Sequence, residues 1–247
     1  MRFPLATIAF APLLLWQGRR VRRAVLRLPE AGGARTGAVG EGERLRLLVL
    51  GDSSAAGVGV ADQADALAGQ LVALLAIDHR VLWRLEAGSG DQLADLLARL
   101  DTLAHEDFDA VVVAIGVNDA TARTGTTAWR AGLRRLLAGI TARFGEPMVI
   151  VCAIPPMQLF PALPRPLADW LGMAAARLNQ ATRKVLANDP RAHFLGFDFD
   201  TDPQWMCEDG FHPSAAGYRR WAEAVVNALR EHVSTVPNND PEQGVLP

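Results

Sequence analysis

Short hydrophobic runs alternate with longer amphipathic stretches through most of this 247-residue chain. The hydrophobic runs predict five strands, at residues 45–50, 81–86, 110–115, 148–154 and 193–197. The amphipathic stretches predict helices at about 64–77, 91–104, 127–144, 167–188 and 214–232. The first, third and fourth runs are almost continuously hydrophobic, which is typical of strands covered on both faces. This alternation predicts an α/β fold with three layers (αβα), built on a flavodoxin-like, five-stranded parallel sheet.

The segments that flank this predicted domain, residues 44–233, differ from it in composition. Residues 29–43 are rich in proline, glycine and polar residues, which predicts a linker. Residues 234–247 have the composition of a flexible tail. Residues 1–28 combine an apolar stretch, FPLATIAFAPLLLW, with the basic run RRVRR. The sequence therefore divides into four parts.

The N-terminal segment has the pattern of a helix that lies on a membrane surface. Its apolar stretch of 14 residues is short for a bilayer span and contains two prolines. On a helix, five arginines share one side, and they are Arg19, Arg20, Arg22, Arg23 and Arg27. Such a helix attracts anionic lipid headgroups. Dense arginine after an apolar segment favours the cytoplasmic face. Two alternatives stay open: a periplasmic domain with an uncleaved anchor, and a helix packed on its own domain.

Charge and cysteine content exclude several classes of partner. Residues 1–28 hold six arginines and no acidic residue, so the rest of the chain is mildly acidic and nucleic acid is not expected as a partner. Cys152 and Cys207 are too few for a disulfide framework and lack metal-ligand spacing, although a single pair stays possible. The run DFDTD at 198–202 resembles the start of a calcium loop, but Pro203 stands where the sharp turn needs glycine. No metal or cofactor is expected, and no oligomeric state is predicted.

The first predicted strand ends in the motif Gly51-Asp52-Ser53, followed by several small residues. A Walker phosphate loop would need a lysine after Gly57, and a dinucleotide fingerprint would need a glycine where Asp62 stands. Both phosphate-binding interpretations therefore lack an essential residue. A serine exposed at the top of the sheet remains, with Asp52 expected to hydrogen-bond to the turn backbone.

Two further strand ends and one loop carry candidate chemistry. After the second strand, Gly90 can present backbone N–H groups to an anion or oxyanion, or can simply form a turn. After the third, Asn118 can donate to an oxyanion or cap the next helix, and Asp119 is expected to bind turn backbone. In DGFHPS at 209–214, Asp209 can accept a hydrogen bond from Nδ1 of His212, which leaves Nε2 free as a base.

These four blocks, in this order, resemble those of the SGNH hydrolases, the GDSL-type lipases and acylhydrolases. The resemblance implies that Ser53 is the nucleophile, His212 the general base and Asp209 the acid that orients it. It also implies an oxyanion hole formed by the backbone N–H groups of Ser53 and Gly90 and by the side chain of Asn118.

The substrate is less sharply predicted. Ser54 replaces the leucine of the GDSL label, which affects the wall of the acyl pocket rather than the nucleophile. The apolar, proline-rich stretch at 155–167 can form part of that pocket or merely cover the sheet edge. The residues expected to bind substrate are Met157, Phe160, Trp205 and Met206.

The resemblance implies a serine ester hydrolase, of the carboxylesterase or lipase type, that cleaves a short-chain or lipid-like carboxylic ester through an acyl-enzyme intermediate. An O-deacetylase or acyltransferase acting on envelope carbohydrate is the alternative within the enzyme class. A non-catalytic binding scaffold with the same fold is the alternative outside it. The expected partners are a small-molecule ester or lipid and, through residues 1–28, a membrane surface.

Overall fold

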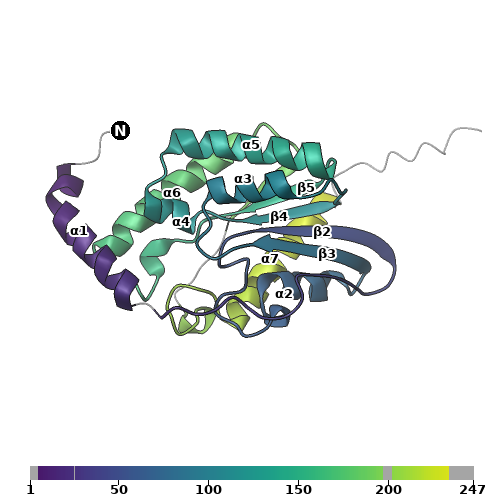
Figure 1. Cartoon of the computed structure of the whole chain (residues 1–247), viewed down its shortest axis with the longest axis horizontal. Coiled ribbons are helices and arrows are strands. Elements are labelled where there is room, and N and C mark those ends of the chain that lie inside the picture. Colours follow the sequence, from purple (N-terminus) through teal and green to yellow (C-terminus); the bar gives the residue numbers. More distant parts are fainter. Residues whose placement is uncertain (1–4, 25, 197–201, 234–247) are drawn as a thin grey trace, which may run out of the picture.

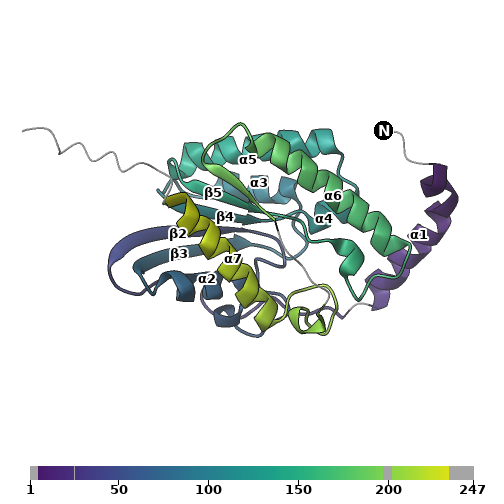
Figure 2. The same cartoon turned by 180° about the vertical axis from the view of Figure 1, so that it is seen from behind.

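A mostly parallel sheet forms the centre of the protein, with helices on both of its faces (Figures 1 and 2). The computed structural model describes residues 5–24, 26–196 and 202–233. In these ranges the sheet has six strands, in the order β1-β3-β2-β4-β5-β6. Their bounds are β1 Thr36–Val39, β2 Glu43–Gly51, β3 His79–Ala87, β4 Ala110–Ala114, β5 Met148–Cys152 and β6 Ala192–Leu195.

The five predicted strands are all present and run parallel, as β2 to β6. Their spatial order, β3-β2-β4-β5-β6, is the flavodoxin-like order and confirms the predicted α/β fold. Every residue of β4 is buried, and so are the last five residues of β2. β4 and the buried end of β2 are therefore hydrophobic at successive positions, because helices cover both of their faces.

The sixth strand, β1, corrects the prediction of a five-stranded sheet. It lies inside residues 29–43, the predicted linker, and pairs antiparallel with the edge of β3, from Thr36 opposite Arg84 to Val39 opposite Val81. All four of its side chains are exposed, so it shows no hydrophobic run or alternation. Because β1 is held by backbone pairing to an edge strand rather than by burial, its composition did not distinguish it from a linker.

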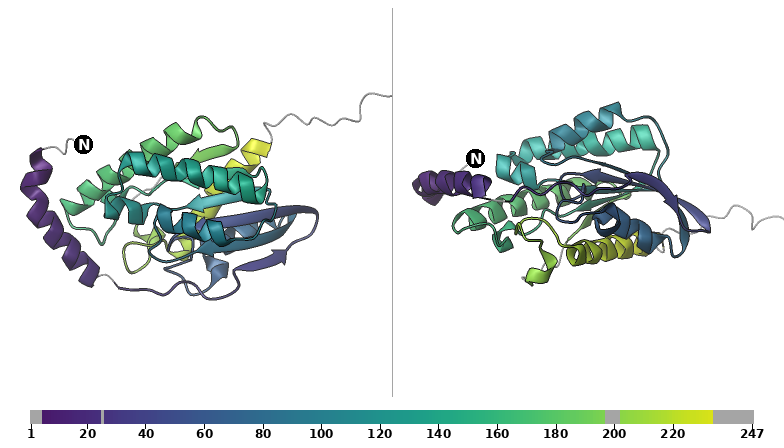
Figure 3. Two further views of the ribbon diagram at one scale, coloured as in Figure 1. Left: turned by 45° about the horizontal axis from the view of Figure 1, so that its top comes forward. Right: turned by 60° about the horizontal axis from the view of Figure 1, so that its bottom comes forward.

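The helices divide between the two faces of the sheet (Figure 3). On one face, Leu48 and Leu50 of β2 pack with α3, α5 and α6; on the other, Leu47 and Val49 pack with α2 and α7. The alternation of these four residues follows from the two-residue period of a strand. The helices are α2 Leu67–Leu75, α3 Leu93–Thr102, α4 Val117–Ala122, α5 Thr126–Phe144, α6 Leu167–Leu186 and α7 Ala215–Val233. Three single 3-10 turns, η1 Gln63–Asp65, η2 Met157–Leu159 and η3 Pro203–Trp205, complete the described elements.

The N-terminal helix α1, Leu5–Ala24, lies at the end of the molecule toward which the parallel strands point (Figure 1). Leu14 and Val21 pack against the core beside α6. Gln17 is buried: its side chain donates to the carbonyl oxygen of Arg165 (2.7 Å) and accepts from the N–H of Leu167 (3.1 Å). One side of α1 is thus attached to its own domain. None of the described helices is both long enough and apolar enough to cross a bilayer.

The helix expected from the arginine pattern extended through residue 28, but α1 ends at Ala24. Arg27 and Leu28 lie in an irregular segment beyond it. The predicted tail, residues 234–247, lies outside the described residues, as does most of the calcium-loop-like run at 198–202.

Candidate active site

Ser53 lies in the turn that follows β2, at the carboxyl edge of the sheet, and its side chain is half-buried. A Cβ on Gly51, the last residue of β2, would lie 2.2 Å from the carbonyl oxygen of Ala114 on β4. Glycine is therefore required for this close approach of the two strands. The turn is closed after Ser53, whose carbonyl oxygen accepts from the N–H of Val58 at 3.0 Å. This backbone arrangement presents the hydroxyl of Ser53 at the edge of the sheet.

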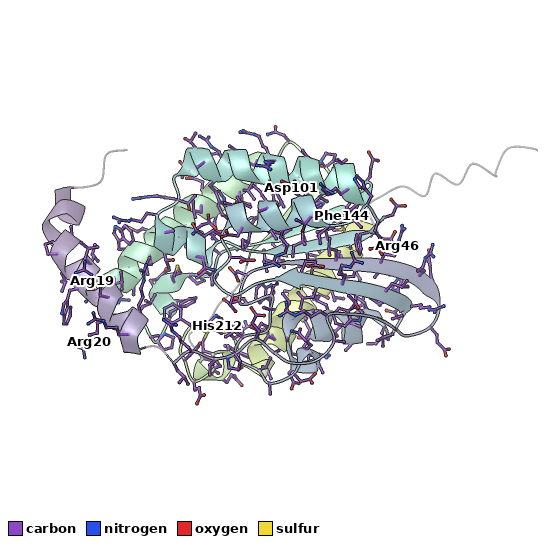
Figure 4. All side chains as sticks on the ribbon, in the orientation of Figure 1. Arg19, Arg20, Arg46, Asp101, Phe144 and His212 are labelled. Atoms are coloured by element: carbon purple, nitrogen blue, oxygen red, sulfur yellow. The ribbon has the colours of Figure 1, made fainter. Side chains whose placement is uncertain are left out.

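His212 lies within hydrogen-bond distance of Ser53, although 159 residues separate them in the sequence. Its Nε2 is 2.9 Å from Oγ of Ser53, and its Nδ1 is 2.6 Å from Oδ2 of Asp209. A tight loop holds the ring, because the N–H of Cys207 donates to the carbonyl oxygen of His212 at 2.9 Å. Figure 4 shows His212 at the end of the sheet where the strands terminate. The aspartate, the histidine and the serine thus form one continuous chain of hydrogen bonds.

Asp209 is buried and is held as a carboxylate by several donors. Its Oδ1 accepts from the backbone N–H groups of Phe211 (2.7 Å) and His212 (2.9 Å) and from the thiol of Cys207 (3.0 Å). Burial alone would raise the pKa of Asp209, but the hydrogen bonds, first that from His212, outweigh burial and hold the pKa far below its ordinary value. Asp209 therefore accepts from Nδ1 of His212, which leaves Nε2 free to accept a proton.

Gly90 and Asn118 are brought together beside the serine turn because β3, β2 and β4 are neighbours in the sheet. Gly90 follows β3 with a φ of +88°. It lies in a turn in which the N–H of Asp91 donates to the carbonyl oxygen of Gly88 (3.2 Å). Asn118 lies in the first turn of α4, and its Nδ2 donates to the carbonyl oxygen of Asp91 at 3.0 Å. An asparagine amide carries two N–H donors, so one remains for a ligand.

Two aspartates next to these residues bind the surrounding backbone, as expected. Asp52 is buried, and its Oδ1 accepts from the N–H of Ser54 at 3.0 Å. Burial raises the pKa of Asp52 to about 6. Asp119 is also buried: it accepts from the N–H of Leu93 (2.9 Å) and from the hydroxyl of Thr124 (2.9 Å). Burial raises the pKa of Asp119 as well, and its hydrogen bonds connect α4 to the start of α3.

A mostly apolar cavity of about 30 Å³ lies beside Asp52 and Ser54. Of the four residues predicted to bind substrate, Phe160 and Met206 line it. Met157 does not line it and is fully buried in the core. Trp205 does not line the cavity either, and its ring is covered by the guanidinium of Arg220. Neither Met157 nor Trp205 thus lines this cavity, and a role in substrate binding stays a prediction for all four residues.

The cavity is also lined by residues that were not predicted from the sequence to bind substrate. Its apolar wall includes Val117, Ile154, Phe211 and Trp221. Val117 precedes Asn118, Phe211 precedes His212, and Ile154 ends the fourth hydrophobic run, so proximity to the predicted site residues and strand ends could have identified these three. Trp221 is an ordinary core residue of α7 by sequence. It reaches the cavity only through the packing of α7 on the sheet.

The two cysteines are not paired in the structure. Cys152 is buried, and its sulfur accepts from Nε1 of Trp221 at 3.4 Å. Burial raises the pKa of Cys152 to about 12 and that of Cys207 to about 11, so both are neutral thiols. Within the described ranges, no cluster of three or more histidine, cysteine, aspartate or glutamate side chains is arranged to hold a metal ion.

The fold and the four blocks at the carboxyl edge of the sheet define the protein as an SGNH-type hydrolase. The model of the GDSL-like lipase/acylhydrolase family matches residues 49–220, and the chain belongs to this family. A search of curated proteins finds no match to the sequence.

Several solved structures have similar folds, and some of them are lipases or esterases by their titles. TesA superimposes with a TM-score of 0.63 at 25% identity, covering 76% of this chain and 99% of TesA. The psychrotrophic esterase EstA from a Pseudoalteromonas species, inhibited by monoethylphosphonate, gives a TM-score of 0.56 at 19% identity, covering 76% and 98%. A carbohydrate esterase family 2 enzyme from Corynascus thermopiles gives 0.60 at 14% identity, covering 84% and 69%. The last two likenesses concern the fold alone.

Proposed function

We propose that this protein is a serine esterase or acylhydrolase that cleaves carboxylic esters through an acyl-enzyme intermediate. The observation that carries the proposal is the hydrogen-bonded chain from Asp209 through His212 to Ser53, with distances of 2.6 and 2.9 Å. A serine hydroxyl is a weak nucleophile until an adjacent base accepts its proton. Nε2 of His212 is the atom within reach of that proton.

The reaction has two symmetrical halves. Oγ of Ser53 attacks the ester carbonyl carbon while its proton passes to Nε2 of His212. The tetrahedral intermediate then collapses, the C–O bond to the alcohol breaks, and the alcohol leaves with the proton from His212. Water, activated by the same nitrogen, releases the carboxylic acid from acyl-Ser53. The carboxylate of Asp209 stabilises the imidazolium that forms in each half.

The negative charge of the tetrahedral oxygen needs donors that are already in place. The N–H groups of Ser53 and Gly90 and the free N–H of Asn118 are the candidates. Asn118 is fixed by its bond to Asp91, so little reorganisation is needed when charge develops.

The proposed substrates carry a short acyl group. The support for this proposal is the cavity lined by Asp52 and Ser54, the residues on either side of Ser53; its volume of about 30 Å³ has room for only about two water molecules. The walls formed by Phe160, Met206 and Phe211 favour an apolar group over a sugar ring. We therefore expect the specificity constant kcat/KM on p-nitrophenyl esters to fall from acetate and butyrate to octanoate. A higher value for octanoate would contradict the short-chain assignment, and activity confined to acetylated sugars would indicate a carbohydrate deacetylase.

The first experiment is labelling with a fluorophosphonate probe, followed by mapping of the modified peptide. We expect modification at Ser53 in the wild type and none in the Ser53→Ala variant. The His212→Ala variant should label far more slowly, because its serine lacks a base. Labelling of another serine would contradict the assigned nucleophile. Folded wild-type protein that neither labels nor hydrolyses any ester would favour a non-catalytic scaffold.

We further propose that α1 associates with an anionic membrane surface, on the cytoplasmic face. One side of α1 faces its own domain through Gln17, and the opposite side is open. Leu15 and Trp16 on α1 are more than half exposed. Four exposed arginines continue the helix, two of which are labelled in Figure 4: Arg19, Arg20, Arg22 and Arg23. Exposed apolar side chains beside a basic cluster fit the boundary between headgroups and acyl chains.

Sedimentation with vesicles tests this membrane proposal. The protein should bind phosphatidylcholine vesicles only when they contain phosphatidylglycerol, and added salt should weaken the binding. Replacing the four arginines with glutamine should abolish the binding. A control variant with the same change of charge uses four exposed arginines elsewhere: Arg44, Arg80, Arg134 and Arg177. Equal binding by both variants would contradict a specific role of α1.

A further inference from the structure

Residues 30–35, which we call the strap, connect the turn after β2 with the turn after β3. At its start, the backbone N–H of Ala31 donates to the carbonyl oxygen of Ala56 at 3.2 Å. At its end, the carbonyl oxygen of Arg35 accepts from the N–H of Leu85 at 2.7 Å, just before β1 begins. Both ends of the strap are therefore attached to the elements that carry the candidate active site.

The first residue of the strap, Glu30, holds the turn after β3 directly. Its Oε1 accepts from the backbone N–H of Ser89 at 2.7 Å. Its Oε2 forms an ion pair with Arg35, whose guanidinium also donates to the carbonyl oxygen of Ala87 at 2.9 Å. Although burial alone would raise the pKa of Glu30, the hydrogen bonds from Ser89 and Arg35 outweigh it and hold the pKa below its ordinary value. Glu30 is thus a charged acceptor, which makes the stronger kind of hydrogen bond.

The turn that Glu30 holds has no packing over its tip. Ser89 and Gly90 are exposed, and a Cβ on Gly90 would meet no heavy atom within 4 Å. An exposed turn that contains glycine is flexible unless hydrogen bonds restrain it. Restraints act on both sides of Gly90. After it, Asp91 accepts a bond from Asn118 and forms an ion pair with Arg99; before it, the N–H of Ser89 donates to Glu30.

We propose that Glu30, itself oriented by Arg35, is a positioning residue that fixes the N–H of Gly90 for the oxyanion. This inference rests on the proposed function. The strap lies outside residues 49–220, the part of the chain that the family model matches. The support that Glu30 gives to the turn is therefore additional to the four family blocks. Glu30 holds the Gly88–Ser89 peptide, which is adjacent to the peptide that carries the N–H of Gly90. It therefore influences the transition state, in which the oxygen is charged, more than the bound substrate.

The test compares Glu30→Ala with Glu30→Gln and with a control, Asp78→Ala. The control removes an exposed carboxylate that is ion-paired with Arg230, far from the turn. In Glu30→Ala we expect kcat and kcat/KM on p-nitrophenyl acetate to fall about tenfold, with KM nearly unchanged. Inhibition by a trifluoromethyl ketone, which forms an oxyanion on the serine, should weaken in parallel. Glu30→Gln keeps a carbonyl acceptor and should recover much of the loss, and Asp78→Ala should match the wild type.

A second variant, Ser89→Pro, tests whether Glu30 acts through its hydrogen bond with the N–H of Ser89. With it, the conclusion no longer depends only on Glu30→Ala being stably folded. Ser89 is the second residue of the β-turn closed by Gly88 and Asp91, a position that proline favours. Ser89→Pro removes the N–H that Glu30 accepts while stiffening the turn. In this background, Glu30→Ala should have no further effect on kcat.

The outcomes separate this inference from the proposed function. Wild-type protein without turnover or serine labelling would overturn the proposed function. Wild-type protein with turnover that Glu30→Ala leaves unchanged would overturn only the role of Glu30. The same loss from Glu30→Ala in the wild-type and the Ser89→Pro backgrounds would show that Glu30 does not act through this turn, and would also overturn the inference.

Discussion

The buried carboxyl group of Asp52 makes the stability of the fold depend on pH. Asp52 stands next to Ser53, is 2% exposed and lines the apolar cavity. Burial raises its pKa from 3.8 to about 6, and the N–H groups of Ser54 and Gly116 and the neighbouring His212 offset this only in part. The native state therefore binds this proton more tightly than the unfolded chain does. The resulting stabilisation is fully present below pH 3.8 and is lost as the pH rises through about 6.

The size of the effect follows from the two pKa values. At about 1.4 kcal/mol for each pKa unit, the free energy of unfolding should fall by about 3 kcal/mol as Asp52 ionises. Asp209 acts in the opposite direction, because its pKa is lowered in the native state. The contribution of Asp209 to the free energy of unfolding is present above the ordinary aspartate pKa of 3.8 and is lost as the pH falls below that value. Between roughly pH 4 and pH 7, ionisation of Asp52 therefore lowers the free energy of unfolding, and Asp119, whose pKa burial also raises, acts in the same direction, so the contribution of Asp52 is isolated by comparison with Asp52→Asn.

Urea unfolding at several pH values in this range measures the effect. The wild type should lose about 3 kcal/mol relative to Asp52→Asn, whose side chain cannot ionise. The variant can differ by a constant offset, because asparagine replaces one acceptor with a donor, but its profile should lack this slope. Asp65→Asn, a matched change at an exposed aspartate, should follow the wild type. Parallel profiles for wild type and Asp52→Asn would refute the reasoning.

Three other changes test the site and the N-terminal segment. Asp209→Asn should lower kcat by about 10³–10⁴-fold, because His212 loses the partner that sets its tautomer. Turnover assays measure this loss, and thermal unfolding should show little change in stability. Asn118→Ala should lower kcat by about 10²–10³-fold while fluorophosphonate labelling still maps to the same serine. Deleting residues 1–28 should leave an active domain. Deleting residues 1–40 also removes the strap and β1, so this variant should have a lower unfolding midpoint than the shorter deletion. Equal midpoints for the two deletion variants would contradict a structural role for residues 29–40.

The parallel core of the sheet was predictable from the sequence because local periodicity reports burial. Runs such as 110–115 are hydrophobic at successive positions only where helices cover both faces of a strand. The antiparallel strand β1 carries no such signal, since its four side chains are exposed. Its formation depends on the free edge of β3, which is a property of the assembled sheet.

The residues of the candidate site could also be predicted from the sequence, because they lie in four short motifs. Each motif alone is a weak signal, but Ser53 and His212 could be selected because four such motifs follow one another in the order of the family blocks. Their approach to 2.9 Å across 159 residues of sequence required the fold. The residues that line the cavity were the weakest prediction, because a methionine or tryptophan in an apolar loop gives the same sequence pattern whether it lines a cavity or fills a core.

The sequence by itself thus determined the order of strands and helices and the residue types at the strand ends. Only the tertiary structure decided that Met157 is buried away from the cavity, that Trp221 reaches it, and that Glu30 holds the turn at Gly90. The physical reason is that periodicity and turn chemistry act between residues close in sequence. Which distant side chains meet is decided by how the covered faces of the sheet pack and by which backbone groups the sheet edges leave free.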